Sequence, residues 1–352
     1  MRPALCFVMA GGGTGGHVMP LVAVARELRR RGHRAVFIGT RRGLEARLAP
    51  AEGFPIEWIE IGGLNRVGLR RALRSAGQII PALLRARRVL RKQQPGAVFS
   101  LGGYVAGPVV LMEPNAVAGI TNRWMGRFAK RALVNFAETV AQFPAGKAEV
   151  TGVPVRPEFF AIEPKAPTEE LTLLVTGGSQ GSQRLNEAVR QSWPLFRESN
   201  LRIRFIHQTG RWNHEELARE FASSGLPGQV VSFIDDMPAA FREADLVICR
   251  SGAGAVSELA AAGRPSILVP FPFAAGQHQL RNAELMVRAG AARLVPESEL
   301  SGRRLFEEVA ALAAAPEKLV RMSEAARALA RPDAAARAAD VLEELASVKK
   351  QH

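Results

Sequence analysis

One short pattern occurs in each half of the chain: an apolar strand, a glycine-rich turn and then a helix. In the first half, apolar residues 5–9 lead into Gly11–Gly16, and residues 18–31 place apolar side chains at helical spacing before Gly32. In the second half, residues 171–175 lead into a turn at 176–181, and a helix is expected at 183–192. Strand–helix–strand order with short links implies parallel strands joined by right-handed crossovers. The pattern therefore predicts an α/β protein.

Because the pattern restarts, we expect two doubly wound, Rossmann-like domains that face a cleft. A length of 352 residues suits two domains. The predicted N-terminal domain is 1–155 and the C-terminal domain 156–332, and 333–352 is an alanine-rich helix expected to cross back over the junction. Further elements of the second domain are strands at 202–207, 230–233, 246–249 and 266–269 and a helix at 255–262 ended by Gly263.

The composition limits the setting in which the protein acts. No stretch of 18 apolar residues is present, so no transmembrane helix is expected, and the first residues read as a strand instead of a signal peptide. Cys6 and Cys249 lie in apolar runs, which predicts buried, reduced thiols. The net charge of +14 favours an anionic partner, with high arginine usage in the genome as the plainer alternative.

The first glycine turn can bind an anion but is a poor dinucleotide site. Gly11, Gly13 and Gly16 match G-x-G-x-x-G between a strand and a helix, where backbone N–H groups face a ligand. A dinucleotide site also wants an acidic residue after the second strand, and this strand, at 35–38, is followed by Gly39–Arg42. NAD is disfavoured, whereas NADP and a tight turn without a ligand remain open.

Two turns in the second half suit a nucleotide diphosphate. One is 176–181, and the other is 250–254, which opens a helix carrying Glu258. A carboxylate at this point can accept hydrogen bonds from both ribose hydroxyls, or it is simply a solvated helix residue. No metal-binding motif is visible, and Asp235 and Asp236 are adjacent and would face opposite sides of a strand. We therefore expect no tightly bound cofactor and no required divalent metal.

The motifs, taken together and in order, resemble the MurG family over nearly the whole chain. They are AGGGTGGHVMP at 10–20, GGY at 102–104, EPNAVAG at 113–119, TNR at 121–123, GVPVR at 152–156, GGSQG at 177–181, FIDDM at 233–237, residues 249–258, and Gln279 with Asn282 and Ala283. The resemblance implies the GT-B fold and transfer of GlcNAc from UDP-GlcNAc, with inversion, to the C4 hydroxyl of MurNAc in undecaprenyl-linked lipid I. The product would be lipid II, for peptidoglycan synthesis, at the inner face of the cytoplasmic membrane.

The resemblance also implies a set of donor and acceptor residues. Ile234 would present its backbone to uracil, Glu258 would bind the ribose and Gln279 would read sugar hydroxyls. The remaining implied residues are Ser179, Gln180, Arg156, Gly252, Ala253, Gly254, Ala255, Val256 and Ser257 for the donor, Thr14, Gly15, Gly16 and Asn115 for the sugar or the acceptor diphosphate, and Tyr104 and Asn122 for the acceptor.

An inverting transfer needs a base, and two residues are candidates. Histidine as a residue type titrates near neutral pH, and His17 lies at an expected helix start, where the dipole would disfavour a protonated ring. Glu113 is the competing candidate. A histidine that only binds phosphate or caps the helix is an equal alternative for His17, as is simple packing for Tyr104.

Two departures from the family bear on these residues. The family usually has Thr at the position of Ala255, so one hydroxyl contact to the phosphates would be missing. The family also carries a helix and a strand between Pro108 and Glu113, where only residues 109–112 remain. A parallel crossover takes a dozen residues or more. Either the N-terminal sheet lacks a strand or a segment is missing from this sequence.

A basic stretch points to a membrane surface. Residues 61–112 contain nine Arg or Lys and no Asp or Glu, and the basic residues flank the apolar run 79–84. An amphipathic segment of this kind suits an anionic membrane, where a polyprenyl-linked acceptor would lie, and a solvated helix face is the alternative. Nucleic acid is disfavoured because no aromatic residues are interleaved. A peripheral protein of the inner membrane, with a cell-wall synthesis complex as a further partner, is expected.

Two rival functions remain open at this stage. A UDP-GlcNAc 2-epimerase has the same fold but needs no lipid acceptor. A non-catalytic subunit that binds sugar nucleotides would not need His17 or Glu113.

Overall fold

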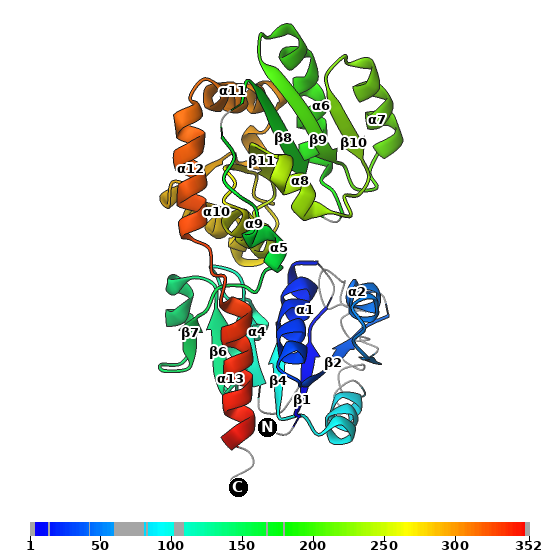
Figure 1. Ribbon diagram of the computed structural model, residues 1–352, viewed down its shortest axis with the longest axis vertical. Helices are drawn as coiled ribbons and strands as arrows, with labels where there is room; N and C mark the ends of the chain where they lie inside the picture. Colours follow the sequence, from blue (N-terminus) through cyan, green and yellow to red (C-terminus); the bar gives the residue numbers. More distant parts are fainter. Residues whose placement is uncertain are drawn as a thin grey trace. The chain divides into compact units, whose positions relative to one another are not determined.

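The computed structural model describes residues 4–12, 15–41, 43–59, 81, 84–101, 109–166, 168–178 and 180–348. The chain divides into two compact units. Unit 1 is Met1–Val155 with Asp333–His352, and unit 2 is Arg156–Pro332. The C-terminal helix therefore belongs to the same unit as the N-terminus (Figure 1).

Unit 1 is a parallel α/β layer structure. Its elements are β1 (Cys6–Ala10), α1 (Gly15–Arg30), β2 (Arg34–Gly39), α2 (Glu45–Ala51), β3 (Ile56–Trp58), a helical stretch at 84–93, β4 (Ala97–Ser100), β5 (Val109–Glu113), α4 (Ile120–Met125), β6 (Arg131–Val134), the 3-10 helix η1 (Ala137–Gln142), β7 (Ala148–Val150) and α13 (Ala334–Val348). In the described residues the strands pair in parallel in the order β3-β2-β1-β4-β5-β6-β7. The order reverses between β1 and β4.

The inner strands of unit 1, namely β1, β2, β4, β5 and β6, are buried on both faces, which explains their nearly continuous apolar sequence. On one face Phe7 and Met9 of β1 pack with Leu28 of α1 and Leu342 of α13. On the other face Val8 packs with neighbouring strands and with the helical stretch at 84–93. Alternate residues of one strand thus belong to two separate core clusters.

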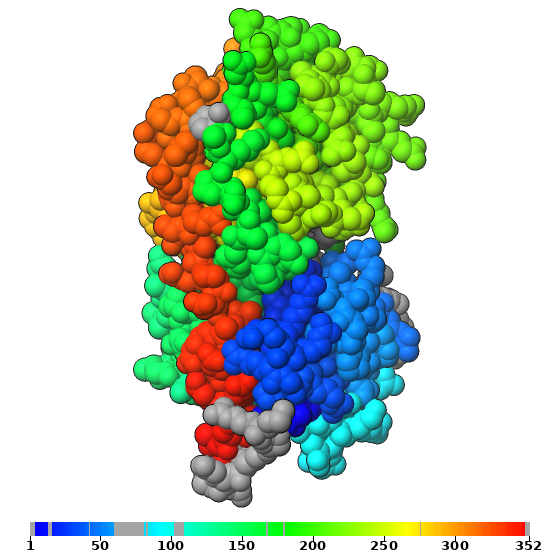
Figure 2. Space-filling model, viewed as in Figure 1, coloured from blue at the N-terminus to red at the C-terminus, as the bar shows by residue number. Residues whose placement is uncertain are grey.

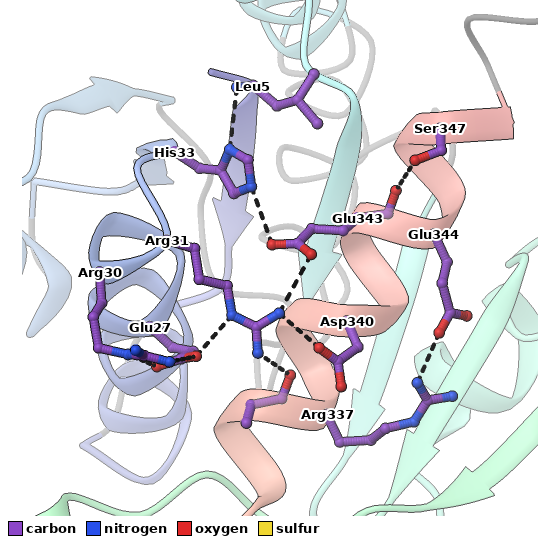
Figure 3. Close-up of polar contacts among 11 residues, drawn as sticks. Leu5, Glu27, Arg30, Arg31, His33, Arg337, Asp340, Glu343, Glu344 and Ser347 are labelled. Atoms are coloured by element: carbon purple, nitrogen blue, oxygen red, sulfur yellow. Dashed lines mark hydrogen bonds and ion pairs between the residues drawn. The ribbon is translucent and has the colours of Figure 1, made fainter. Parts of the chain in front are cut away.

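Charged residues hold α13 against α1 at the end of the latter helix (Figure 3). Arg31 donates to Asp340 at 2.6 Å and to the backbone carbonyl of Ala336 at 3.1 Å. Glu343 lies 3.3 Å from Arg31 and 3.0 Å from the ring of His33. The surface of α13 lies flush beside that of α1 (Figure 2). The last helix is therefore an integral part of unit 1.

Unit 2 repeats the architecture. Its elements are α5 (Pro157–Phe160), β8 (Glu170–Thr176), α6 (Gln183–Glu198), β9 (Arg202–Gln208), α7 (His214–Ser223), β10 (Gly228–Val231), α8 (Met237–Glu243), β11 (Leu246–Cys249), α9 (Ala253–Ala262), β12 (Ser266–Leu268), η2 (Ala275–Gln277), α10 (His278–Arg288), β13 (Ala292–Leu294), η3 (Glu297–Glu299), α11 (Gly302–Ala313) and α12 (Pro316–Ala328). The parallel sheet has the order β10-β9-β8-β11-β12-β13, which reverses between β8 and β11. The predicted pair of doubly wound sheets is confirmed.

One predicted strand boundary needs correction, and one of the two alternatives left open for the short segment is excluded. The strand expected at 230–233 is Gly228–Val231. It starts early because Gly228 adopts φ +130° and lies so close to Phe205 that a Cβ would be 2.0 Å from that residue's carbonyl oxygen. The sheet of unit 1 has also lost no strand at the short segment, since Val109–Glu113 forms β5 between β4 and β6.

Candidate functional site

Two turns lie side by side where the strand order of the second sheet reverses, between β8 and β11, and this position is called the switch point below. β8 and β11 are neighbours, and their last residues, Thr176 and Cys249, are paired. The chain leaves β8 toward one edge of the sheet and β11 toward the other. Doubly wound sheets bind ligands outside the carboxyl ends of the strands at this point. The turn that contains Gln180 and the turn that contains Gly252 therefore flank the expected binding position.

The turn after β8 requires glycine because backbone segments touch. A Cβ on Gly177 would lie 2.4 Å from the nitrogen of Ser182, and one on Gly181 would lie 2.0 Å from the carbonyl oxygen of Thr209. Gly181 also has φ +76°. Ser182 caps α6 by accepting from the nitrogen of Leu185 at 3.4 Å. Gln180 is exposed, and Ser179 lies outside the described residues.

The turn after β11 brings the start of α9 to Gln279. Gly252 is the N-cap of α9 and supplies no side chain, so the first-turn N–H groups of that helix receive no side-chain cap. Ser251 is fully buried, and its hydroxyl donates to the carbonyl oxygen of Gln279 at 2.8 Å. Oε1 of Gln279 accepts from the nitrogen of Phe271 at 2.9 Å. This contact fixes the carboxamide, so the amino group of Gln279 is the part that can donate to a ligand.

All predicted residues of α9 lie on the first turns of this one helix. They are Ala253, Gly254, Ala255, Val256, Ser257 and Glu258. Because the dipole at a helix start favours negative charge, this end of α9 suits a phosphate group. The side chain of Ala255 carries no hydroxyl to add to those backbone donors.

Glu258 and Arg156 are electrostatically coupled. Burial raises the pKa of Glu258 to about 7, and the nearby charge of Arg156 acts in the opposite direction. The guanidinium of Arg156 lies 5.0 Å from the ring centre of Phe159, and its Nε is buried without a hydrogen-bond partner in the described part of the chain. Both groups would gain from a ligand that supplies hydroxyl donors to Glu258 and an anionic acceptor to Arg156.

Two residues of unit 2 that the sequence analysis did not name form hydrogen bonds to the turns of this site. Gln208, at the end of β9, hydrogen-bonds to the backbone of both Gly178 and Ile234. Arg250 donates to the hydroxyl of Ser182 at 2.6 Å and forms an ion pair with Glu297. Arg250 directly follows the apolar strand β11, which is the signal that could have identified it. The strand that ends in Gln208 also contains Arg202, Arg204 and His207, so no such signal marks Gln208.

In unit 1, the first glycine turn packs around a buried carboxylate. Glu45 is 1% exposed, and a Cβ on Gly12 would be 2.3 Å from its Oε1. Oε1 accepts from the nitrogen of Thr40 at 2.8 Å and from its hydroxyl at 3.0 Å. Because a carboxylate already lies beside this turn, NADP is disfavoured as its ligand. Sequence reasoning missed Glu45, because its close contacts with Gly12, Gly39 and Gly43 appear only in the folded structure.

The predicted residues of this turn occupy the beginning of α1. Gly15 and Gly16 open the helix, and His17 follows with a half-buried side chain. Thr14 and Tyr104 lie outside the described residues. A half-exposed imidazole at a helix start can accept a proton from a bound hydroxyl.

Glu113 is held in a hydrogen-bond network that suits a structural role. It is 2% exposed at the end of β5. Oε1 accepts from the backbone and side-chain nitrogens of Asn115 at 3.0 and 3.1 Å. Oε2 accepts from the nitrogen of Gly119 and from Nδ2 of Asn122, both at 2.9 Å. With four donors on its two oxygens, Glu113 orders the segment that leads into α4.

Asn122 likewise serves the interior. It is 6% exposed, and Nδ2 also donates to the carbonyl oxygen of Met112 at 3.1 Å. The side chain has almost no exposed surface in this structure, and its expected contact with an acceptor stays a prediction. Asn115 remains half-buried, with its amide directed to Glu113.

Features that would indicate another kind of site are missing from the described residues. No group of His, Cys, Asp or Glu there could hold a metal ion. No described helix has the length and apolar character needed to cross a bilayer.

A cavity of about 760 Å³ in unit 2 is lined by residues at the amino ends of its strands, such as Leu171 and Ile203. That is the opposite end of the sheet from the glycine turns.

The comparisons with known proteins agree on one family. The family 28 glycosyltransferase N-terminal domain matches residues 7–134, and the family 28 C-terminal domain matches residues 172–340. The UDP-N-acetylglucosamine--N-acetylmuramyl-(pentapeptide) pyrophosphoryl-undecaprenol N-acetylglucosamine transferase of Solibacter usitatus is 57% identical over 97% of both chains. The protein of the same name from Anaeromyxobacter dehalogenans is 42% identical over 96% of this chain and 92% of its own.

Solved structures give the same result. The crystal structure of Acinetobacter baumannii MurG has a TM-score of 0.79 and 33% identity, and the match covers 97% of this chain and 100% of that one. The UDP-GlcNAc 2-epimerase of Neisseria meningitidis, at 13% identity, TM-score 0.66 and coverage of 96% and 99%, shares the fold alone. The chain belongs to the MurG family of GT-B glycosyltransferases.

Proposed function

We propose that the protein transfers GlcNAc from UDP-GlcNAc, with inversion, to the C4 hydroxyl of MurNAc in undecaprenyl-diphosphate-linked lipid I, forming lipid II for peptidoglycan. The observation that carries the proposal is the cluster at the switch point of unit 2. Three groups of unit 2 come together there. They are the N–H groups at the start of α9, which have no side-chain cap, Arg156, whose buried Nε has no hydrogen-bond partner in the described residues, and Glu258, whose pKa is raised by burial. These groups match a diphosphate and a ribose diol. The names of the relatives state the same donor sugar and acceptor.

In the proposed reaction the C4 oxygen of the acceptor bonds to C1 of GlcNAc on the face opposite to UDP. The bond from C1 to the phosphate oxygen breaks, and its electron pair leaves with UDP. The start of α9 and Arg156 stabilise the negative charge that develops on the leaving group. His17 accepts the hydroxyl proton as general base. The turn with Gln180, the backbone of Ile234, Glu258 and Gln279 hold the donor.

A transfer assay with labelled UDP-GlcNAc and a short-chain lipid I analogue tests this function. The expected result is a labelled disaccharide-lipid product together with one UDP per transfer. Formation of UDP-ManNAc from UDP-GlcNAc alone would identify an epimerase instead. A protein that binds UDP-GlcNAc but forms neither product would be a non-catalytic subunit. No specific feature of the structure favours either rival.

The finer location that we propose is the cytoplasmic face of the inner membrane, where the protein is peripheral and open to a cell-wall synthesis complex. An apolar ridge supports this proposal. Ile120, Trp124 and Phe128 recur every four residues from α4 onward and are 88%, 59% and 66% exposed. The rings of Trp124 and Phe128 lie 5.3 Å apart. Two arginines, Arg123 and Arg127, alternate with these residues in the sequence, and both are exposed. Large apolar side chains among cations suit an anionic bilayer interface.

The basic stretch adds charge of the same sign. In the helical stretch at 84–93, Ala86 and Val89 face the core of unit 1. The basic residues are exposed, namely Arg85, Arg87, Arg88, Arg91 and Lys92. Residues 60–80, with Arg70, Arg71 and Arg74, lie outside the described residues.

Cosedimentation with anionic liposomes separates the two contributions. Reversing the charges at Arg85, Arg87, Arg88 and Arg91 is expected to weaken binding at low salt, and this defect should shrink as salt rises. Replacing Trp124 and Phe128 with serine is expected to weaken binding at every salt concentration, because the loss is apolar. Substitution of the exposed Trp212 in unit 2 is the matched control. Unchanged partitioning of both variants at moderate salt would remove the membrane proposal.

A further inference from the structure

A single buried carboxamide joins two of the turns assigned to the donor. Gln208 is the last residue of β9 and is 1% exposed. In the sheet it lies beside Thr176, the last residue of β8. A buried amide costs free energy unless its donors and acceptor are hydrogen-bonded. Loss of any partner of Gln208 would therefore destabilise the folded protein.

Each end of the carboxamide serves a different turn. Nε2 donates to the carbonyl oxygen of Gly178 at 2.9 Å and to the hydroxyl of Thr176 at 3.3 Å. Oε1 accepts from the backbone nitrogen of Ile234 at 3.0 Å. The donor partner and the acceptor partner fix which way the amide faces. The distance between the glycine turn after β8 and the segment at Ile234 is therefore set by the length of one glutamine side chain.

The contact also decides what the backbone of Ile234 can offer. Its N–H is used inside the protein, whereas its carbonyl oxygen accepts no hydrogen bond from the described residues. A lone acceptor pairs with a base that has an N–H at ring position 3, as uracil does. In cytosine the nitrogen at position 3 is an acceptor. Its lone pair would face the carbonyl oxygen of Ile234, and no hydrogen bond could form between them.

We propose that Gln208 is a positioning residue that fixes the spacing of the two turns and restricts the base pocket to pyrimidines with a donor at N3. The inference rests on the proposed function, because it takes Ile234 to face the base. Gln208 acts through the backbone of Gly178 and Ile234 and touches no reacting atom.

Titration calorimetry of the full chain with UDP and with CDP tests the proposal. The wild-type protein is expected to prefer UDP. Gln208→Leu releases the N–H of Ile234, which can then donate to cytosine, so the ratio of CDP to UDP dissociation constants is expected to fall by about fivefold, the worth of one hydrogen bond. UDP itself should bind more weakly. Gln208→Asn, which keeps the amide but is one methylene shorter, should change the ratio in the same direction and serves if Gln208→Leu does not fold.

Thr176→Val is the matched control on the neighbouring strand. It removes a buried hydroxyl that contacts Gln208 and Gly178 but leaves the bond between Gln208 and Ile234 in place. Its UDP affinity is expected to fall with no change in the ratio. Equal loss of UDP and CDP affinity in both Gln208 variants, or no loss at all, would overturn the inference while the transferase proposal stands. A wild-type protein that binds neither nucleotide would overturn the proposed function as well.

Discussion

Arg31 and Asp340 are separated by 309 positions in the sequence, and their side chains meet at 2.6 Å. Arg31 lies just beyond α1, the helix that starts with the glycine turn and His17, and Asp340 lies in the last helix of the chain. Nε of Arg31 also donates to the carboxylate of Glu27 at 2.7 Å. These carboxylates raise the pKa of Arg31 against the effect of its burial, so the guanidinium stays charged.

Removal of this cation should destabilise unit 1. We expect Arg31→Met to lower the free energy of unfolding by about 1–2 kcal/mol, because several partners lose one shared donor. Denaturant unfolding at low and high salt measures the effect, which should shrink with salt. The matched control is Arg30→Met, since that side chain is 73% exposed and, within the part of the chain that the structure describes, forms an ion pair with Glu27 alone. An equal effect of the two substitutions would show that α13 is not held by this cluster.

His17 and Glu113 should differ in kind when substituted. His17→Ala removes the proposed base and is expected to lower kcat by about 100-fold or more, with little change in UDP-GlcNAc affinity or melting temperature. In the wild-type protein, N–H donors face both carboxylate oxygens of Glu113. Glu113→Gln replaces one of these oxygens with an amino group that faces the same donors, so the substitution should destabilise the protein by about 2 kcal/mol. Steady-state kinetics and thermal melts on both variants check this assignment. A Glu113→Gln protein that melts normally but has lost catalysis would make Glu113 the base.

Glu258 should make donor binding depend on pH. Its pKa of about 7 in the free protein means that ribose hydroxyls, which favour the carboxylate form, must displace a proton below pH 7. The dissociation constant of UDP-GlcNAc is therefore expected to rise by up to about tenfold per pH unit on going down from pH 7. The same burial makes the free protein lose stability as the pH rises from 4.5 through 7.

Calorimetry of UDP-GlcNAc binding in buffers of different ionisation enthalpy measures the proton released. In Glu258→Gln the affinity should be lower and independent of pH. A pH-independent affinity of the wild-type protein between pH 5.5 and 8 would refute a ribose contact through this carboxylate.

His207 should confer acid sensitivity on unit 2. It is fully buried, and its ring nitrogen Nε2 lies 3.1 Å from Oδ1 of Asn186. Burial lowers its pKa to about 3, and the charge of His214 acts in the same direction. The unfolded chain therefore binds more protons than the folded one between about pH 6.5 and 3, and stability is lost as the pH falls through this window. His207→Gln should melt at a temperature that depends less on pH in that range. Equal slopes would contradict a buried neutral histidine.

The fold could be predicted because its signals are local. An apolar strand, a glycine turn and a helix recur in each half, and Gly263 ends α9 in the left-handed conformation as its position suggested. The ends of strands were less certain, since the start of β10 depends on a tertiary contact between Gly228 and Phe205. The short segment before residue 113 left open whether a strand of this sheet was lost. The structure shows Val109–Glu113 paired in parallel with β4 on one side and β6 on the other.

The site residues were predictable only in part, for a related reason. The turn at 250–254 and Glu258 could be proposed from the pattern of strand, turn and helix, whereas Ala255, Val256 and Ser257 were implied only by the family resemblance. Gln208 and Glu45 act through contacts made across turns, which no local pattern encodes. Glu113 was named as a base candidate, and its four hydrogen-bond donors come from residues that only the folded structure brings to it.

The return of α13 to unit 1 has a consequence for biosynthesis. A ribosome makes the chain from its N-terminus, so all of 156–332 emerges before the residues that cover one face of the first sheet. Until then Phe7, Met9 and Leu28 lack the apolar partner Leu342 and remain partly open to water. The half of the protein that is synthesised first is thus the half that is completed last.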